Sequence, residues 1–394
     1  MFNMTHFLKK CNHVTKKKNN LILGNMSNEN KEQICIVVAG SVDSGKSTFI
    51  GILDKNILDD GNGFARKYVA KHKHEIESGR TSDISVKSLE TQNKSIVLVD
   101  LCGHAKYLKT TLFGITGYFP DYAIVTIAAN RGVLPMTREH LGILLYMKIP
   151  FIIVVTKVDI APKNVYERTM KAIDKIIKIP KFKKKPLKIN SDKDFYLDNK
   201  NLKLKEAEST EYIKNVVKMI NNDNKYVPVI SISNKTGYYL DVVKNFINLL
   251  KPRKKWNNDI NGSIFYIDST FTPPGVGLVL SGLVKGKNIS LGDNILIGPF
   301  NKEYIQSTIW SIHDNDKNSI KTLADGERGC IAIRIKKKTF SRKNIRKGMV
   351  CLSDLSLTNR TCFEFYATID ILNHSTTINN NYSPVIHCGI IKQS

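Results

Sequence analysis

One short stretch near the start of the chain constrains its fold more than any other feature. The apolar run at residues 34–39 leads directly into Gly40-Ser41-Val42-Asp43-Ser44-Gly45-Lys46-Ser47, and a helical pattern begins at Lys46. A glycine-rich turn between a buried strand and a helix directs backbone N–H groups inward at the helix N-terminus, which suits phosphate groups. In this context Lys46 neutralises the outer phosphates and the Ser47 hydroxyl is a Mg²⁺ ligand. The stretch predicts a nucleotide-binding domain.

Beyond this loop the sequence alternates short apolar runs with helical patterns, which is typical of a parallel sheet covered by helices. Strands are predicted at residues 34–39, 96–100, 122–128, 151–156 and 227–232. Helices are predicted near residues 46–53, 64–77, 105–116, 137–146, 165–177 and 240–250. We therefore expect an α/β domain with a doubly wound, mostly parallel sheet over residues 34–250.

The pattern changes near residue 250. A basic linker at residues 251–255 precedes short β-rich runs that are separated by turn signals such as Pro273-Pro274-Gly275 and Asp325-Gly326. This spacing predicts an all-β barrel over residues 251–360. A further β segment begins near Thr361, and residues 361–394 are too few for an independent β-domain, so we expect a truncated second β-barrel there.

The chain is strongly basic, with 60 Lys and Arg against 35 Asp and Glu and a formal charge of +25. The surplus lies mainly in residues 1–33, which we interpret as a flexible basic tail, in a Lys-rich solvated insert near 181–205, and in the C-terminal part. This distribution indicates a polyanionic partner such as RNA. A general bias of the chain towards Lys, Asn and Ile explains it equally well. Likewise, the run Lys183-Lys184-Lys185 is either an RNA contact or a solvated loop.

Several other classes of protein are disfavoured. The seven Cys form no CxxC pair, which favours a reducing compartment over a disulfide framework or a zinc ribbon. No apolar run approaches the ~20 residues of a membrane span, because Lys148 interrupts the stretch 141–155. His72, His74 and His387 lack the spacing of a complete zinc set. We expect a cytoplasmic protein with no membrane contact.

A second group of residues is spaced as a nucleotide switch requires. Asp100 ends a predicted strand, where its carboxylate can hold Mg²⁺ through water, and the N–H of Gly103 can meet a γ-phosphate. His104 then lies beside the attacking water, and Thr81 lies in a polar loop where its hydroxyl can close over the metal. Taken alone, His104 and Thr81 would be an ordinary structural histidine and an ordinary loop threonine. Their order and spacing favour the catalytic interpretation.

A third group predicts which base is bound. Thr156-Lys157-Val158-Asp159 ends a predicted strand and presents a carboxylate at the edge of the nucleotide crevice. Asp159 can accept hydrogen bonds from guanine N1 and N2, while the stem of Lys157 lies over the base. Ser233 and Asn234 follow the next strand and can supply backbone N–H groups to guanine O6. Together the motifs predict a guanine nucleotide, GTP or GDP.

At this point the chain resembles a known family. The loop Gly-x-Val-Asp-x-Gly-Lys-Ser-Thr, the motif Asp-x-x-Gly-His and the motif Thr-Lys-Val-Asp are similar to those of translational GTPases of the elongation factor Tu and elongation factor 1α type. The string 75–82 (EIESGRTS), the string 100–117 (DLCGHAKYLKTTLFGITG) and the segments 274–277, 345–350 and 387–389 resemble the narrower GTP-binding protein 1 and 2 group. The resemblance covers residues 34–394.

The resemblance implies an α/β P-loop GTPase domain followed by barrels, with partner-stimulated, Mg²⁺-dependent hydrolysis of GTP. It also implies action on the ribosome and tRNA or other RNA in elongation, as a monomer that depends on a stimulating partner in trans. Asp43 would help to place a monovalent cation. The cofactor-binding residues would be Gly40, Asp43, Ser44, Gly45, Lys46, Ser47, Thr48, Asp100, Thr156, Lys157, Asp159, Ser233 and Asn234.

The chain departs from the family pattern at several positions. Ser41 replaces a frequent His, and Cys102 replaces a Pro. Thr156 replaces an Asn that bridges to the phosphate loop in the family, so the sequence does not decide whether this bridge is kept. No arginine stands out as a catalytic finger. Three roles remain: elongation, initiation or ribosome rescue, and a GTP-dependent RNA or decay-complex binding module with vestigial hydrolysis.

Overall fold

The computed structural model describes residues 32–360, except for gaps at 71–74, 76–80, 92, 181–182, 190–205, 254–259, 301–302, 315–316, 336–341 and 347, and short pieces after residue 360. The predicted tail, up to residue 31, lies outside the described residues, as do 190–205 of the insert and most of the predicted second barrel. The first strand begins at Glu32, two residues before the predicted domain start.

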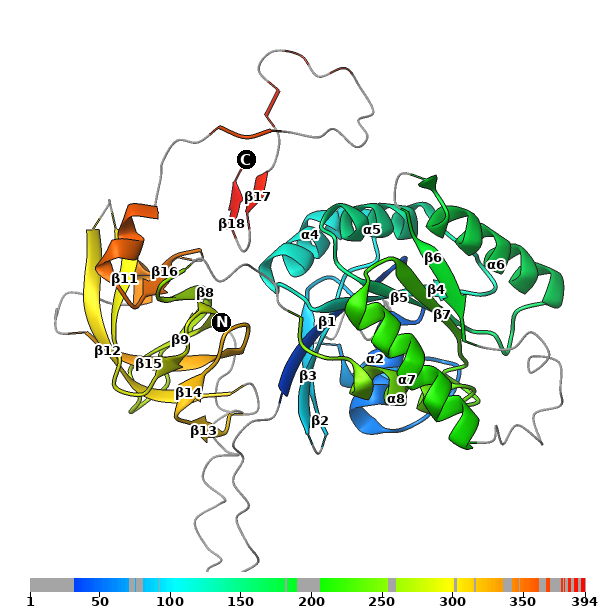
Figure 1. Ribbon diagram of the computed structural model, residues 1–394, viewed down its shortest axis with the longest axis horizontal. Helices are drawn as coiled ribbons and strands as arrows, with labels where there is room; N and C mark the ends of the chain where they lie inside the picture. The colour runs from blue at the N-terminus through cyan, green and yellow to red at the C-terminus, as the bar shows by residue number, and fades with distance from the viewer. Residues whose placement is uncertain are drawn as a thin grey trace, which may run out of the picture. The chain divides into compact units, whose positions relative to one another are not determined.

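The nucleotide-binding domain is built on a seven-stranded sheet with the strand order β2-β3-β1-β4-β5-β7-β6 (Figure 1). All neighbouring pairs are parallel except β2 and β3. The strands are β1 (Glu32–Gly40), β2 (Ser85–Glu90), β3 (Lys94–Asp100), β4 (Tyr122–Ala128), β5 (Phe151–Thr156), β6 (Lys185–Lys188) and β7 (Tyr226–Ser231). The predicted doubly wound, mostly parallel sheet is confirmed.

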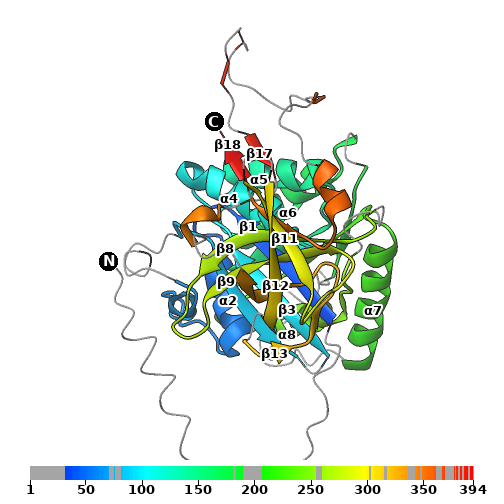
Figure 2. The same ribbon diagram turned by 90° about the vertical axis from the view of Figure 1, so that its left-hand side faces the viewer.

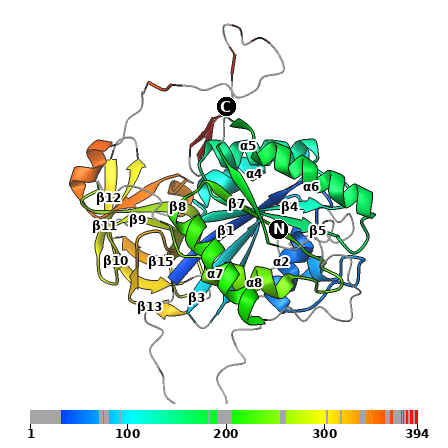
Figure 3. The ribbon, with the colours of Figure 1, turned by 45° about the vertical axis from the view of Figure 1, so that its right-hand side comes forward.

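Helices cover both faces of this sheet (Figure 3). One face carries α2 (Lys46–Lys55), α7 (Glu206–Asn222) and α8 (Leu240–Leu249), and the other carries α4 (Leu108–Gly117), α5 (Pro135–Tyr146) and α6 (Lys163–Ile177). Each face has its own apolar core, because alternate side chains of a strand point to opposite faces. Ile36 and Val38 of β1 join the first core, and Val37 and Ala39 join the second.

The structure differs from the predicted elements in three places. Of the helix predicted at 64–77, the structure describes a 3₁₀ turn, η1 (Ala65–Tyr68), and a helical Glu75; residues 71–74 and 76–77 lie outside the described part. The helix predicted from residue 105 begins with a second 3₁₀ turn, η2 (Ala105–Tyr107), and continues as α4. Strands β2 and β6 and helix α7 are additional; the buried stripe Ile213, Val216, Val217 and Ile220 is the sequence signal for α7.

The Lys-rich insert is not solvated throughout. Its residues 185–188 form β6, which pairs in parallel with β7 at the edge of the sheet. The Lys184 ammonium group is partly buried and donates hydrogen bonds to the main-chain and side-chain oxygens of Asn224. Burial lowers the pKa of Lys184. This lysine therefore anchors the edge strand and is not a free RNA contact.

The second domain is a closed β-barrel, as expected (Figure 2). Its sheet runs β11-β16-β8-β9-β15-β12-β13, and an additional pairing of β11 with β12 closes it. The strands are β8 (Ser263–Phe271), β9 (Leu278–Gly286), β11 (Asn294–Phe300), β12 (Glu303–His313), β13 (Ser319–Ile320), β15 (Arg328–Ile335) and β16 (Val350–Leu352), with β10 (Ile289–Ser290) paired to β14 (Thr322–Leu323). Phe265, Ile297 and Ile331 lie in its core.

Two 3₁₀ turns flank β16, the last strand of the barrel in the sequence: η4 (Arg342–Asn344) precedes it and η5 (Leu355–Arg360) follows it. Of the predicted second barrel, the structure describes an antiparallel hairpin of β17 (Ile386–Cys388) and β18 (Ile391–Gln393). Among the described residues, each helix is too short or too polar to cross a lipid bilayer.

Candidate functional site

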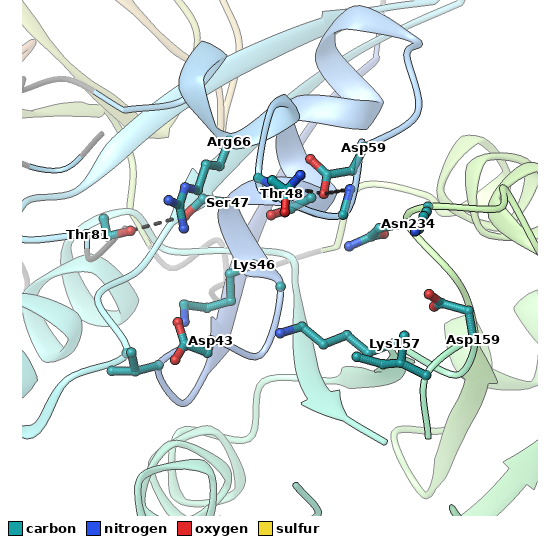
Figure 4. A pocket seen from close by; sticks show the side chains of 18 of the residues that line it. Asp43, Lys46, Ser47, Thr48, Asp59, Arg66, Thr81, Lys157, Asp159 and Asn234 are labelled. Atoms are coloured by element: carbon teal, nitrogen blue, oxygen red, sulfur yellow. Dashed lines mark hydrogen bonds between the residues drawn. The ribbon is translucent and has the colours of Figure 1, made fainter. Parts of the chain in front are cut away.

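A pocket opens where the loops after β1, β3, β5 and β7 converge at the carboxyl ends of the parallel strands (Figure 4). Ligands of open α/β sheets bind at this edge. The cavity volume is about 300 Å³, at the lower end of the range for small-molecule sites. The predicted residues that line it are Asp43, Gly45, Lys46, Ser47, Thr48, Thr81, Gly103, His104, Lys157, Asp159 and Asn234. The others, Gly40, Ser44, Asp100, Thr156 and Ser233, are not among its lining residues.

The loop after β1 is held by its own side chains. Lys46 Nζ and Ser44 Oγ each donate a hydrogen bond to the carbonyl oxygen of Ser41, and both donor–acceptor distances are 2.8 Å. The Ser44 hydroxyl also contacts the Thr126 hydroxyl of β4 at 2.7 Å. Lys46 is 6 % exposed. Burial lowers its pKa, and the nearby negative charge of Asp100 partly offsets this shift. The loop therefore places a buried cation at the floor of the pocket.

A histidine that the sequence analysis did not identify supports the loop from behind. His140 of α5 is fully buried, and its Nδ1 accepts a hydrogen bond from the backbone N–H of Gly40 over 3.1 Å. Burial lowers the pKa of His140 to about 4, and the charge of Lys46 acts in the same direction. A neutral ring is required for this contact, because a protonated imidazole has no acceptor. No sequence motif marks this position.

Three oxygen-bearing side chains meet beside the loop. Ser47 Oγ donates a hydrogen bond of 2.6 Å to Asp100 Oδ2, and Thr81 Oγ1 donates one of 3.4 Å to the same oxygen. The two hydroxyl oxygens lie 3.1 Å apart. Asp100 Oδ1 is buried without a hydrogen-bond partner among the described residues. Burial raises the pKa of Asp100 to about 6, although Lys46 opposes this shift. Two hydroxyls and a carboxylate with a spare oxygen fit the oxygen ligands that Mg²⁺ prefers.

Gly103 and His104 also line the pocket. A Cβ added to Gly103 would lie 2.5 Å from Lys46 Nζ and 2.7 Å from the main chain of Ser41, so only glycine permits this close approach. His104 Nδ1 accepts from the backbone N–H of Lys106 over 3.1 Å. In the neutral ring the proton is then on Nε2, which can donate to a water or a phosphate oxygen.

The far end of the pocket carries the residues predicted to bind a base. The Thr156 hydroxyl donates to the carbonyl oxygen of Ser44 over 2.8 Å and so joins β5 to the phosphate loop. Ser233 Oγ accepts from the backbone N–H groups of Lys235 and Thr236 at 3.2 and 3.0 Å, which fixes the turn after β7. Asn234 Oδ1 is buried without a partner in the described part of the chain.

Two further side chains at the pocket were not identified from the sequence. Arg66, from the 3₁₀ turn η1, lines the pocket together with the loop that contains Asp59. Arg131 Nη1 forms an exposed ion pair with Asp43 Oδ2 at 3.2 Å. Both arginines come close to the site only through the packing of distant segments, for which the sequence offers no local signal.

Comparisons with known proteins identify the family of the domain that carries this site. The family described as "Elongation factor Tu GTP binding domain" matches residues 31–255. Similar curated proteins are GTP-binding protein 1 from Xenopus laevis (35% identical over 388 residues, 92% of this chain and 55% of that protein) and GTP-binding protein 2 from Mus musculus (33% over 385 residues, 91% and 60%). Elongation factor 1-alpha from Pyrococcus horikoshii is 26% identical over 386 residues, 91% of this chain and 80% of that protein.

Solved structures give the same fold. Elongation factor SelB from Methanococcus maripaludis, in complex with the GTP analogue GppNHp, superposes with a TM-score of 0.54 at 22% identity, covering 82% of this chain and 55% of that one. A bacterial selenocysteine-specific elongation factor gives 0.57 at 20% identity, covering 82% and 45%. The chain spans 55 to 60% of the length of GTP-binding proteins 1 and 2.

Proposed function

Because the chain belongs to the family of elongation factor Tu GTP-binding domains, we propose that it is a translation-factor-like GTPase that hydrolyses GTP to GDP and phosphate as a conformational switch. The observation that carries this proposal is the meeting of Ser47, Thr81 and Asp100 at one end of a pocket whose other end presents Asp159. The first group suits a metal-bound triphosphate and the second suits guanine.

At the phosphate end of the pocket, different residues would bind the phosphates and the metal ion. Lys46 would neutralise the β- and γ-phosphates, and we assign the backbone N–H groups of Gly45 and Thr48, at the N-terminus of α2, to the phosphate oxygens. Ser47, Thr81 and, through water, Asp100 would hold Mg²⁺, which when bound supplies charge stabilisation to the phosphates. The spare Oδ1 of Asp100 is free for this purpose.

At the base end, Asp159 accepts from the guanine N1 and N2 groups while Lys157 covers the ring. Ser233 and Asn234 form the turn that offers N–H groups to guanine O6. Ser233 contributes through its hydroxyl, which orders the turn. Thr156 and Ser44 connect this end to the phosphate loop, so binding of the base and binding of the phosphates are mechanically coupled.

His104 positions the attacking water. With Nδ1 engaged by Lys106, the neutral ring has a donor at Nε2, so we assign His104 the orientation of the water or the γ-phosphate. Attack is in line, and the charge that develops is stabilised by Lys46 and the loop N–H groups. Loss of the γ-phosphate releases Thr81 and Gly103, which is the switching event.

The cellular role in this proposal is elongation on the ribosome with tRNA or another RNA, in the cytoplasm, as a monomer stimulated by a partner. The +25 charge supports a polyanionic partner. The proposal also includes a monovalent cation near Asp43, where Arg131 already supplies positive charge. Nucleotide release in K⁺ and in Na⁺, compared between the wild type and Arg131→Ala, tests that part.

The role is tested by identifying the RNA that co-purifies with the GTP-bound chain and by measuring phosphate release with and without ribosomes. Aminoacylated tRNA together with ribosomal stimulation supports elongation. Ribosomal subunits alone would instead favour rescue or initiation. Nucleotide retention with no phosphate release under any ribosomal stimulation would overturn the hydrolytic proposal and favour a binding module.

A further inference from the structure

The loop that follows α2 is fixed at the mouth of the pocket. The Asp59 carboxylate accepts hydrogen bonds from the backbone N–H groups of Gly61 (3.0 Å), Gly63 (3.3 Å) and Ala65 (2.9 Å). The Asp59 N–H donates to the carbonyl oxygen of Asn234 over 3.0 Å. One carboxylate thus organises the turn from within, and its backbone ties the turn to the base end of the site.

The other end of this segment is docked on the domain. Ala65, the first residue of η1, and Val69, which follows the turn, are 0% and 2% exposed and belong to the core on the α2 face. The Val69 carbonyl accepts from the buried Ser85 hydroxyl over 2.8 Å. The backbone that carries Arg66 is therefore held by contacts on both sides.

Arg66 folds back over the loop into the pocket. Gly63 has φ +87°, and a Cβ added to it would lie 2.8 Å from Arg66 Nε and 3.0 Å from Cζ, so the guanidinium packs directly on the loop backbone. Figure 4 shows the side chain pointing towards the part of the pocket that contains Ser47 and Thr81. Arg66 lines the pocket together with them.

One donor of the guanidinium lacks an acceptor among the described residues. Arg66 Nε is buried without a hydrogen-bond partner, and Arg66 forms no ion pair within the described ranges of the chain. A buried donor on a charged group costs free energy unless a partner satisfies it. Because the guanidinium presents its donors in a planar fork that matches phosphate oxygens, the missing partner is an anion of that kind.

We propose that Arg66 binds the polyphosphate of the nucleotide, as a substrate-contacting residue supplied within the chain. This inference rests on the proposed function. Lys46 reaches the phosphates from the loop that follows β1, whereas Arg66 reaches them from the loop that follows α2. The chain would thus supply an arginine to its own phosphate site, although no arginine stands out in its sequence as a catalytic arginine finger. A side chain that serves only to pack on Gly63 would leave its buried donor unsatisfied in the nucleotide-bound protein.

The test compares Arg66→Ala and Arg66→Lys with Lys67→Ala, a matched control on the same turn whose ammonium group lies over the Phe64 ring outside the pocket. Affinities for GDP and a non-hydrolysable GTP analogue are measured by titration, and the unfolding temperature is measured with and without nucleotide. We expect Arg66→Ala to weaken nucleotide binding by about 10- to 100-fold. Arg66→Lys should recover part of the loss, and Lys67→Ala should bind like the wild type.

The ligand-free protein separates a phosphate contact from a purely structural role. We expect Arg66→Ala to unfold at the wild-type temperature without nucleotide and to lose part of the stabilisation that nucleotide adds. Unchanged nucleotide affinity of Arg66→Ala would overturn the inference. It would also be overturned if the ligand-free variant unfolded at a lower temperature and this loss of stability accounted for all of the weaker binding. If the wild type itself binds no GTP, the proposed function fails. If the wild type binds GTP and Arg66→Ala binds it equally tightly, only this inference fails.

Discussion

The Thr156 hydroxyl of β5 donates a hydrogen bond to the main-chain carbonyl oxygen of Ser44 over 2.8 Å. Thr156 is fully buried and Ser44 is 1% exposed. The sequence leaves open whether a threonine at this position can replace the bridging asparagine of the related elongation factors. In the structure, this one hydroxyl donor joins β5 to the loop that follows β1.

Replacement of Thr156 by valine keeps the shape of the side chain and removes the donor. The buried Ser44 carbonyl would then lack this partner, which costs about 1 to 3 kcal/mol. We expect Thr156→Val to release GDP about tenfold faster or more, as measured by displacement of a fluorescent nucleotide. Thr169→Val is the control, because Thr169 is also buried and bonds a carbonyl, that of Ala129 at 3.0 Å, away from the pocket. Equal release rates in the two variants would contradict the bridge.

Asp159 should set the choice of base. Its carboxylate accepts from two donors that guanine offers, whereas an amide in its place presents a donor of its own. We expect Asp159→Asn to weaken GTP binding by at least about 100-fold, because the amide N–H group would face the guanine N1 and N2 donors and leave them without an acceptor. Binding of xanthosine triphosphate, which carries a carbonyl oxygen at C2, should improve. The exposed Asp241→Asn on α8 serves as control. Retained preference for GTP in Asp159→Asn would refute the assignment.

His140 makes the stability of the nucleotide-binding domain depend on pH. Its folded-state pKa, about 4, lies below the ordinary value near 6.5, so the unfolded chain binds a proton more readily between these values. The stabilisation is therefore fully present above pH 6.5 and is lost as the pH falls towards 4. The loss amounts to about 2 kcal/mol by pH 5.

The free energy of unfolding in urea at pH 7.5 and pH 5 checks this, with His140→Gln as the comparison. The glutamine carbonyl can still accept from Gly40, yet it does not titrate. The wild type should lose about 2 kcal/mol more than His140→Gln over this interval. Parallel pH dependence in the two proteins would show that His140 is not the titrating group.

The sequence predicts well those parts of the fold that have strong local signals. Strands β1, β4 and β5 are continuous apolar runs buried on both faces, and the structure has them where they are predicted. Strand β2 escapes prediction because its sequence Ser-Val-Lys-Ser-Leu-Glu is half polar at the sheet edge. Strand β6 escapes for a different reason: its register comes from pairing with β7, and its sequence Lys-Pro-Leu-Lys resembles a loop.

The same distinction applies to the site. Lys46, Ser47, Asp100 and Thr81 belong to motifs, and the structure brings them together. His140 and Arg66 belong to no motif, because the first reaches Gly40 through the packing of α5 and the second enters the pocket through the docking of η1. Their roles depend on tertiary contacts that a local pattern does not contain.

Single-turnover phosphate release from GTP on the ribosome, compared between the wild type and His104→Ala, tests whether the pocket hydrolyses GTP as proposed. We expect both proteins to bind GTP with similar affinity, because the role assigned to His104 is to position the attacking water. We expect His104→Ala to release phosphate at least about 100-fold more slowly. A His104→Ala variant that hydrolyses GTP at the wild-type rate under the same stimulation would contradict the role assigned to His104.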